Sequence, residues 1–283
     1  MIVRYDNIIQ FRPAQRGSRK SRRYLCLERL ARASVSRHQG RVTNGTRFMI
    51  TTIGFDADDT LWQNESFFRL TQDRFTALLA DYAGADHLHD RLLAAERRNL
   101  GHYGFGVKGF TLSMIETAIE ITESRVPAAV IAEIMAAGRE MLAHPVELLP
   151  HAEAAVTTLA RDHRVILVTK GDLLDQERKL AQSGLGDLFH AVEIVSDKTP
   201  AVYASIFARH GDGAERALMV GNSLKSDVIP AIAAGGWGAH VPHGLIWALE
   251  HADPPLGNPR FLTLGDLGEL ADAVEAIKSN HNI

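Results

Sequence analysis

Three aspartates follow directly on a short apolar run in the stretch TTIGFDADDTLW, residues 51–62. Like charges at this spacing repel one another, and aspartate is a poor strand residue. Asp56, Asp58 and Asp59 therefore have two interpretations. They belong to a functional site, where chemistry requires what stability avoids, or they form a tight turn whose side chains bond to nearby backbone. The stretch alone favours neither interpretation.

Polar side chains also follow three later apolar runs, each at the point where the run ends. They are Thr169 and Lys170 in RVILVTKGD, Lys198 in AVEIVSDKTP, and Asn222 and Asp227 in ALMVGNSLKSD. If these runs are parallel strands, their carboxyl ends meet at one edge of a sheet, where such sheets bind ligands. Carboxylates, a hydroxyl group and an ammonium group together are what a divalent cation and a phosphoryl group require.

The apolar runs have the length and composition of buried strands. The first two are Ile50–Phe55 and Val165–Val168, two more precede the Lys198 and Asn222 segments, and weaker ones are GWGAHVPH and RFLTL. Helical patterns separate them, at residues 152–162, 172–183 and 200–210. Strands that alternate with helices of this length predict an α/β fold with a doubly wound, Rossmann-like parallel sheet.

The interval from Ser66 to Pro145 breaks this alternation. Its apolar residues recur at helical spacing, among them Phe68, Phe75, Leu79, Leu88, Leu92, Phe110, Met114, Ile134 and Met141. The pattern predicts roughly four helices and no strand. We therefore expect an inserted helical subdomain at residues 66–145, on a core formed by residues 49–65 and 146–283.

Residues 1–48 differ from the rest in charge. They contain 12 Lys or Arg against two acidic residues, so they carry +10 while the whole chain carries −3. A targeting peptide, a basic arm for nucleic acid, and translated upstream sequence before a working start at Met49 all fit this composition. We favour the last, because Met49 stands just before the first strand. Such a charged segment with few apolar residues is expected to be largely disordered.

The remaining composition excludes some classes of protein. No apolar run approaches the roughly 18 residues that a membrane span needs. The single cysteine, Cys26, rules out an internal disulfide framework and suits a reducing compartment such as the cytoplasm. No pattern of stacking aromatic residues supports a nucleic-acid partner, and oligomeric state is not readable from the sequence.

The stretch HYGFGVKGF, residues 102–110, together with the preceding Gly101 places four glycines within the helical interval. Its simplest interpretation is a flexible turn between two helices. The alternative is a substrate-binding loop that places Tyr103 or Lys108 over the active site.

The four polar segments, in this order, resemble the motifs of the haloacid dehalogenase (HAD) superfamily, in its phosphatase branch with a helical cap. DADDT matches the first motif, Thr169 the second, Lys198 the third and GNSLKSD the fourth. The resemblance implies that Asp56 is the nucleophile and Asp58 the general acid/base. It also implies that Thr169 and Lys198 bind the phosphoryl group.

The resemblance further implies a Mg²⁺ cofactor, held by Asp56, the backbone carbonyl of Asp58, and Asp227. Asn222 stands at a position that is often aspartate in the family. Asparagine can coordinate through its carbonyl or order a water, but it brings no charge. Asp227 is therefore expected to be the more direct ligand and Asn222 the weaker one.

The expected function is Mg²⁺-dependent hydrolysis of a small-molecule phosphomonoester through an aspartyl-phosphate. Asp58 must be protonated to protonate the leaving group, and the neighbouring anion favours that form. Dehalogenases and ATPase pumps of the superfamily lack an acid two residues after the nucleophile. A phosphomutase shares both aspartates and remains an alternative, and a non-catalytic protein on the same fold is a weaker one.

Overall fold

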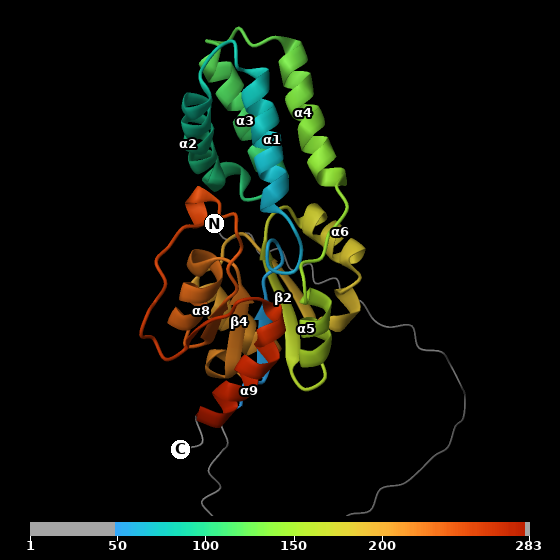
Figure 1. Cartoon of the computed structure of the whole chain (residues 1–283), viewed down its shortest axis with the longest axis vertical. Coiled ribbons are helices and arrows are strands. Elements are labelled where there is room, and N and C mark those ends of the chain that lie inside the picture. Colours follow the sequence, from blue (N-terminus) through green and yellow to red (C-terminus); the bar gives the residue numbers. More distant parts are fainter. Residues whose placement is uncertain (1–48, 281–283) are drawn as a thin grey trace, which may run out of the picture. The chain divides into compact units, whose positions relative to one another are not determined.

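The computed structural model describes residues 49–280, and the predictions for residues 1–48 lie outside this range. Within it, a parallel sheet with flanking helices forms one part of the molecule and four longer helices form another (Figure 1). No helix in the described range is long and apolar enough to cross a membrane.

The sheet contains six strands in the order β3-β2-β1-β4-β5-β6, and each neighbouring pair is parallel. The strands are β1 (Thr52–Phe55), β2 (Arg164–Lys170), β3 (Ala191–Val195), β4 (Ala217–Gly221), β5 (Trp237–His240) and β6 (Phe261–Thr263). The predicted fold class is thereby confirmed. Phe55 is aligned with Leu167 on one side and Val220 on the other, so the central strands end side by side.

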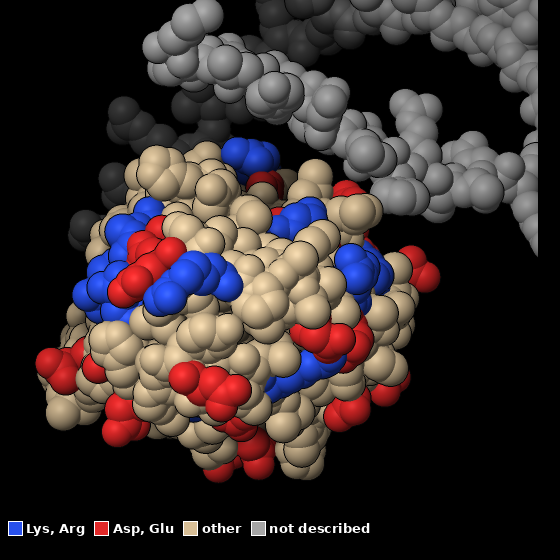
Figure 2. Space-filling model, turned by 90° about the horizontal axis from the view of Figure 1, so that it is seen from above, with Lys and Arg blue, Asp and Glu red and all other residues tan. Residues whose placement is uncertain are grey.

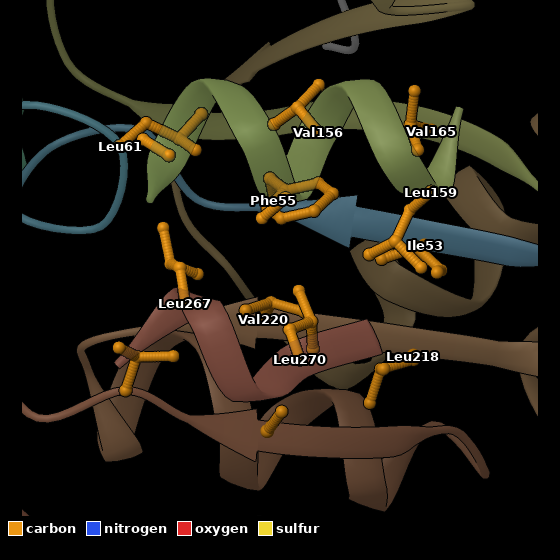
Figure 3. Close-up of a cluster of buried hydrophobic side chains, with 14 of the residues drawn as sticks. Ile53, Phe55, Leu61, Val156, Leu159, Val165, Leu218, Val220, Leu267 and Leu270 are labelled. Carbon is orange, nitrogen blue, oxygen red and sulfur yellow. The ribbon is translucent and has the colours of Figure 1, made fainter. Parts of the chain in front are cut away.

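Helices cover both faces of the sheet. They are α5 (Ala152–Leu159), α6 (Leu173–Ser183), α7 (Pro200–His210), α8 (Ile229–Ala233) and α9 (Leu270–Asn280). Along β4, Leu218 and Val220 pack with α5 and α9, whereas Ala217 and Met219 pack with α7 and α8. This alternation follows from the opposite directions of successive strand side chains. Figure 3 shows the first of these two layers, with Phe55 between Val156 and Leu270.

The four longer helices lie between β1 and α5 in the sequence. They are α1 (Glu65–Leu78), α2 (Ala85–Tyr103), α3 (Val107–Ile121) and α4 (Ala128–Ala143). They share an apolar cluster of their own, which includes Phe75, Leu92, Phe110 and Met114. Several of their arginines are paired with acids, as Arg98 is with Glu116, and Figure 2 shows charges of both signs interspersed on this face. Such exposed pairs stabilise little, so the apolar cluster holds the helices together.

The chain enters and leaves these helices at one place. The Gln63 amide donates to the Glu147 carbonyl at 2.9 Å, and the Leu149 amide donates to the Leu61 carbonyl at 2.9 Å. A bridge between Trp62 and Leu148 lies between these two bonds. The two connecting segments therefore run side by side.

Candidate active site

The carboxyl ends of the strands bring the predicted residues to the wall of one cavity of about 240 Å³. Seven of the eight line it, namely Asp56 and Asp58 after β1, Thr169 and Lys170 at the end of β2, Lys198 after β3, and Asn222 and Asp227 after β4. Four segments separated by up to 171 positions, from Asp56 to Asp227, thus meet at one point, as expected for the edge of a parallel sheet. Lys108 does not line this cavity.

A buried ammonium group joins two carboxylates at the centre of the site. Lys198 Nζ donates to Asp56 Oδ1 and, at 2.6 Å, to Asp227 Oδ1. Burial is the main cause that raises the pKa of Asp56 to about 7, and repulsion by Asp227 adds to it. The positive charge of Lys198 acts in the opposite direction. Burial lowers the pKa of Lys198, but the two carboxylates outweigh burial and raise this pKa above its ordinary value. One ammonium neutralises only one of the two carboxylates, so the group retains a negative charge.

The turn after β4 fixes Asp227. The backbone N–H of Ser223 donates to Asp227 Oδ2 at 3.0 Å, while Lys198 takes Oδ1. A Cβ atom on Gly221 would collide with the Asp227 carboxylate, so glycine is required at this point of the motif. Asn222 lies beside the centre, where its backbone N–H donates to Thr60 Oγ1 at 3.0 Å. Thr60 Oγ1 in turn donates to Asp56 Oδ2 at 3.1 Å.

This donor set fits Mg²⁺. Among the residues that the structure describes, no group of three or more His, Cys, Asp or Glu side chains forms an all-protein cage. Mg²⁺ is usually held in another way, by one or two carboxylates together with waters and substrate phosphate. The excess negative charge of Asp56 and Asp227, next to the Asn222 amide on the same wall, matches that pattern.

Asp58 is held by donors that the sequence did not indicate. Its Oδ1 accepts from Trp62 Nε1 at 2.7 Å and from Lys179 Nζ at 3.0 Å. Its Oδ2 accepts from Gln176 Nε2 at 2.8 Å and from Lys179 Nζ at 3.2 Å. One ammonium group therefore contacts both oxygens of Asp58.

Helix α6 supplies two of these partners, Gln176 and Lys179, from its buried side. Its buried residues are the polar ones, Asp175, Gln176 and Lys179, while Leu173 and Leu174 are 60% and 70% exposed. A helix that packs on a core normally has the opposite arrangement. Burial lowers the pKa of Lys179, but Asp58 and Asp175 outweigh burial and raise this pKa above its ordinary value.

Asp59 has the structural role that the turn interpretation assigned to it. It adopts a positive φ of 59°, and its carboxylate accepts from the backbone N–H groups of Asn64 at 2.9 Å and Glu65 at 2.9 Å. Those groups begin α1 and have no partner inside the helix. Burial raises the pKa of Asp59 to about 6, against the effect of His243. All three aspartates line the cavity, and Asp59 in addition fixes the turn that leads into α1.

Lys170 is committed to other protein groups. Its Nζ lies 2.7 Å from Ser226 Oγ and 2.8 Å from Glu250 Oε1, and 3.8 Å from the centroid of the Phe105 ring. Glu250 also accepts from Ser223 Oγ at 2.6 Å. Burial raises the pKa of Glu250, but Lys170 outweighs burial and keeps this pKa below its ordinary value. Lys170 therefore reaches the cavity with its charge already balanced.

The glycine-rich stretch between α2 and α3 contributes Phe105 rather than Tyr103 or Lys108. Phe105 lines the cavity and packs edge-on to Trp247, with ring centroids 6.1 Å apart. The Lys108 side chain is 54% exposed, with its Nζ 3.5 Å from Asp172 Oδ1. Its backbone N–H also donates to Asp172 Oδ2 at 3.2 Å. Lys108, in the first turn of α3, thus contacts the residue that precedes α6, and its role in substrate binding stays a prediction.

The part of the cavity lined by the four helices is mixed in character. Its apolar side chains include Phe68, Leu93, Leu100 and Phe110, and its polar and charged ones include Arg69, Gln72, His89, Glu65 and Glu96. Trp247 Nε1 donates to Glu96 Oε2 at 3.3 Å. Burial raises the pKa of Glu96 to about 7, although the hydrogen bond from Trp247 lowers it. Burial and the nearby Asp59 together raise the pKa of Glu65 to about 7. Neither glutamate could be assigned from the sequence, because helical periodicity does not say which helix end faces the sheet.

A model of the haloacid dehalogenase-like hydrolase family matches residues 50–235. A search of the curated proteins finds no match. Among solved structures, a haloacid dehalogenase-like family hydrolase from Xanthomonas campestris is 43% identical, with a TM-score of 0.73 over 82% of this chain and 95% of that one.

Two further solved structures have the same fold at lower identity. The HAD-hydrolase YfnB from Bacillus subtilis, bound to magnesium, is 16% identical, with a TM-score of 0.57 over 80% of this chain and 99% of that one. The L-2-haloacid dehalogenase from Xanthobacter autotrophicus is 18% identical, with a TM-score of 0.54 over 81% of this chain and 100% of that one. At this identity the likeness extends to the fold alone, and different reactions are named among these proteins.

Proposed function

Because the chain belongs to the haloacid dehalogenase-like hydrolase family, we propose that it is a Mg²⁺-dependent phosphatase acting on a small-molecule phosphomonoester. The observation that carries the proposal is the second carboxylate, Asp58, on the cavity wall two residues after Asp56. Hydrolysis of a phosphomonoester needs a proton for the leaving oxygen, and Asp58 is the acid that can supply it. A dehalogenase that releases halide needs no such proton.

In the first step, an oxygen of Asp56 attacks phosphorus while the bond from phosphorus to the leaving oxygen breaks. Asp58 gives its proton to that oxygen, so the alcohol departs neutral. Thr169 and Lys198 bind the phosphoryl oxygens, and the Lys198 charge offsets the repulsion between Asp56 and the phosphate. Asp56 is the nucleophile of this proposal because it is the carboxylate at the end of the central strand β1.

In the second step, Asp58 removes a proton from water, and the water oxygen attacks the same phosphorus. The bond to Asp56 breaks, inorganic phosphate leaves, and both aspartates return to their starting forms. Mg²⁺, when bound, supplies positive charge that neutralises phosphate oxygens and orients them for in-line attack. Asp56, Asp227, Asn222 and the Asp58 carbonyl are the groups proposed to hold it.

The leaving group is proposed to lie between the sheet and the four helices. We take residues 66–145 as the cap that selects it and residues 49–65 with 146–283 as the catalytic core. The apolar side chains Phe105 and Phe110 suit an apolar part of the leaving group, while Arg69, Glu65 and Glu96 offer contacts of both charges. The single cysteine supports the proposal that the protein acts in the cytoplasm.

Purified protein freed of metal by chelation tests the proposal. We expect no hydrolysis of p-nitrophenyl phosphate by the metal-free protein and recovery on addition of Mg²⁺. A panel of phosphoesters then ranks leaving groups, and 2-chloropropionate serves as the dehalogenase control. Activity that persists in chelator, or chloride release from 2-chloropropionate, would contradict the proposed reaction. A need for a sugar bisphosphate would identify a phosphomutase instead.

A further inference from the structure

Two side chains of α6 contact Asp58 from outside the strand ends that supply the other cavity residues. We infer that Gln176 and Lys179 are positioning residues that hold the Asp58 carboxylate in place for proton transfer. This inference rests on the proposed function, in which Asp58 is the acid and base.

The contacts reach both oxygens of the carboxylate. Asp58 receives four contacts, one from Trp62, one from Gln176 and two from Lys179. Trp62 belongs to the same turn as Asp58, so α6 supplies the contacts that reach Asp58 from other parts of the described chain. Without those contacts, rotation about the side-chain bonds of Asp58 would be limited by Trp62 alone.

Lys179 is itself held rigidly. It is 9% exposed, its Nζ donates to Asn64 Oδ1 at 2.8 Å, and it lies 3.6 Å from Asp175 Oδ2. Asn64 precedes α1, so a single ammonium group joins Asp58 to the point where the chain enters the four helices. Its position is therefore set by α6, by the aspartate turn and by the entry to α1 together.

Gln176 is oriented toward Asp58 at the expense of its own amide oxygen. Its Nε2 donates to Asp58 Oδ2 and, at 3.1 Å, to the Lys170 carbonyl. Its Oε1 is buried and has no hydrogen-bond partner among the described residues. A buried acceptor without a partner is unfavourable, and a residue chosen for stability alone would avoid it. This is the kind of local conflict that functional sites contain.

The inference predicts that these residues act only through Asp58. During proton transfer Asp58 exchanges one of its four contacts for the substrate oxygen or the attacking water, while the others keep its direction. Loss of Lys179 or Gln176 should then lower kcat and leave KM nearly unchanged. The loss should be larger for an ester whose leaving group needs a proton.

A double-mutant cycle tests this prediction. Lys179→Met and Gln176→Leu are each made in the wild type and in Asp58→Asn, and assayed on p-nitrophenyl phosphate and glycerol 2-phosphate. In the wild type we expect kcat on glycerol 2-phosphate to fall roughly 10- to 100-fold, with a smaller fall on p-nitrophenyl phosphate. In the Asp58→Asn background we expect no further fall, since the group being positioned is gone.

Gln182→Leu, an exposed glutamine on the same helix, is the matched control and should keep wild-type kcat. Lys179→Arg keeps a donor and should recover part of the activity lost in Lys179→Met. Melting temperatures verify folding, and Gln176→Leu carries the test if Lys179→Met does not fold. The inference would be overturned if Lys179→Met or Gln176→Leu lowered kcat further in the Asp58→Asn background, or if these variants changed KM and not kcat. Wild-type protein without phosphatase activity would overturn the proposed function, and the inference with it.

Discussion

Lys198 Nζ lies 2.6 Å from Asp227 Oδ1 while it also donates to Asp56, so one buried ammonium joins the end of β1 to the turn after β4. Each of the two carboxylates is less than one-tenth exposed. Removal of Lys198 would leave two buried carboxylates uncompensated, a loss that typically destabilises a protein by about 3–5 kcal/mol, whereas removal of one carboxylate leaves a one-to-one pair. Variants at these positions must therefore be examined for metal binding and for folding separately.

The first prediction concerns the metal ligands. Binding of Mg²⁺ to the folded protein raises its melting temperature, because a ligand that binds only the folded state stabilises it. We expect Asp227→Ala to remove nearly all of this rise and Asn222→Ala to reduce it modestly. Asn222→Asp, which adds a charge, should lower the Mg²⁺ concentration needed for half of the effect. Thermal unfolding across a Mg²⁺ titration measures all three.

Asp172→Ala provides the control for this titration, because Asp172 contacts Lys108 outside the cavity and should leave the Mg²⁺ response intact. A larger loss in Asn222→Ala than in Asp227→Ala would mean that the two ligand assignments must be exchanged.

The second prediction separates the two aspartates of the cavity. Asp56→Asn should abolish turnover, because no aspartyl-phosphate can form. Asp58→Asn should lower kcat on glycerol 2-phosphate by roughly 10²–10⁴, the usual range for general acid–base catalysis. The loss should be smaller on p-nitrophenyl phosphate, whose leaving group departs without a proton. Equal losses on both esters would argue that Asp58 is not the acid.

The third prediction uses the aromatic wall. Phe105 lies in the cavity between Lys170 and Trp247, so Phe105→Ala removes apolar surface from the proposed leaving-group site. We expect KM to rise roughly tenfold, which corresponds to about 1.4 kcal/mol of binding, with kcat changed much less. Tyr103→Ala is the matched control, because Tyr103 ends α2 two residues before Phe105, is 50% exposed and does not line the cavity. A comparable rise of KM in the control would assign the effect to the loop as a whole.

The fourth prediction concerns stability and pH. Burial raises the pKa of Glu96 from 4.5 to about 7, so the folded state holds a proton that the unfolded state has already released. This contribution to stability is complete below pH 4.5 and is lost as pH rises to 7. Glu96→Gln cannot ionise and keeps the acceptor for Trp247. It should match the wild type near pH 4.5 and exceed it by up to about 3 kcal/mol above pH 7.

Urea unfolding at pH 4.5 and pH 8 measures this difference. Glu153→Gln, a substitution of the same type on the exposed side of α5, should have no such pH dependence. A Glu96→Gln variant that is less stable than the wild type at pH 8 would show that the ionised carboxylate is stabilising where it lies.

Much of the fold was predictable from local patterns in the sequence. Buried strands such as β2 are short apolar runs, and their carboxyl ends must meet once the sheet is parallel, which brings Asp56 and Asp227 together. The four helices of the insert also follow from spacing alone. These features depend on periodicity and on chain direction, and both are explicit in the sequence.

The remaining site residues depend on packing that no local pattern encodes. Gln176 and Lys179 contact Asp58 because α6 turns its polar side inward, which contradicts the usual rule for amphipathic helices. Phe105 lines the cavity whereas Tyr103 and Lys108 do not, and no spacing in the sequence distinguishes these three residues. Glu96 meets Trp247 across 151 positions of sequence, and only the three-dimensional arrangement relates them.

The paired segments at Gln63–Glu147 and Leu61–Leu149 have a consequence for how this molecule can diversify. Because the chain leaves and rejoins the sheet at adjacent points, residues between them can be lengthened, shortened or replaced without moving the strands beneath. The four helices could therefore be exchanged between relatives as one segment. A relative with different helices could then accept a different substrate while its catalytic aspartates stay the same.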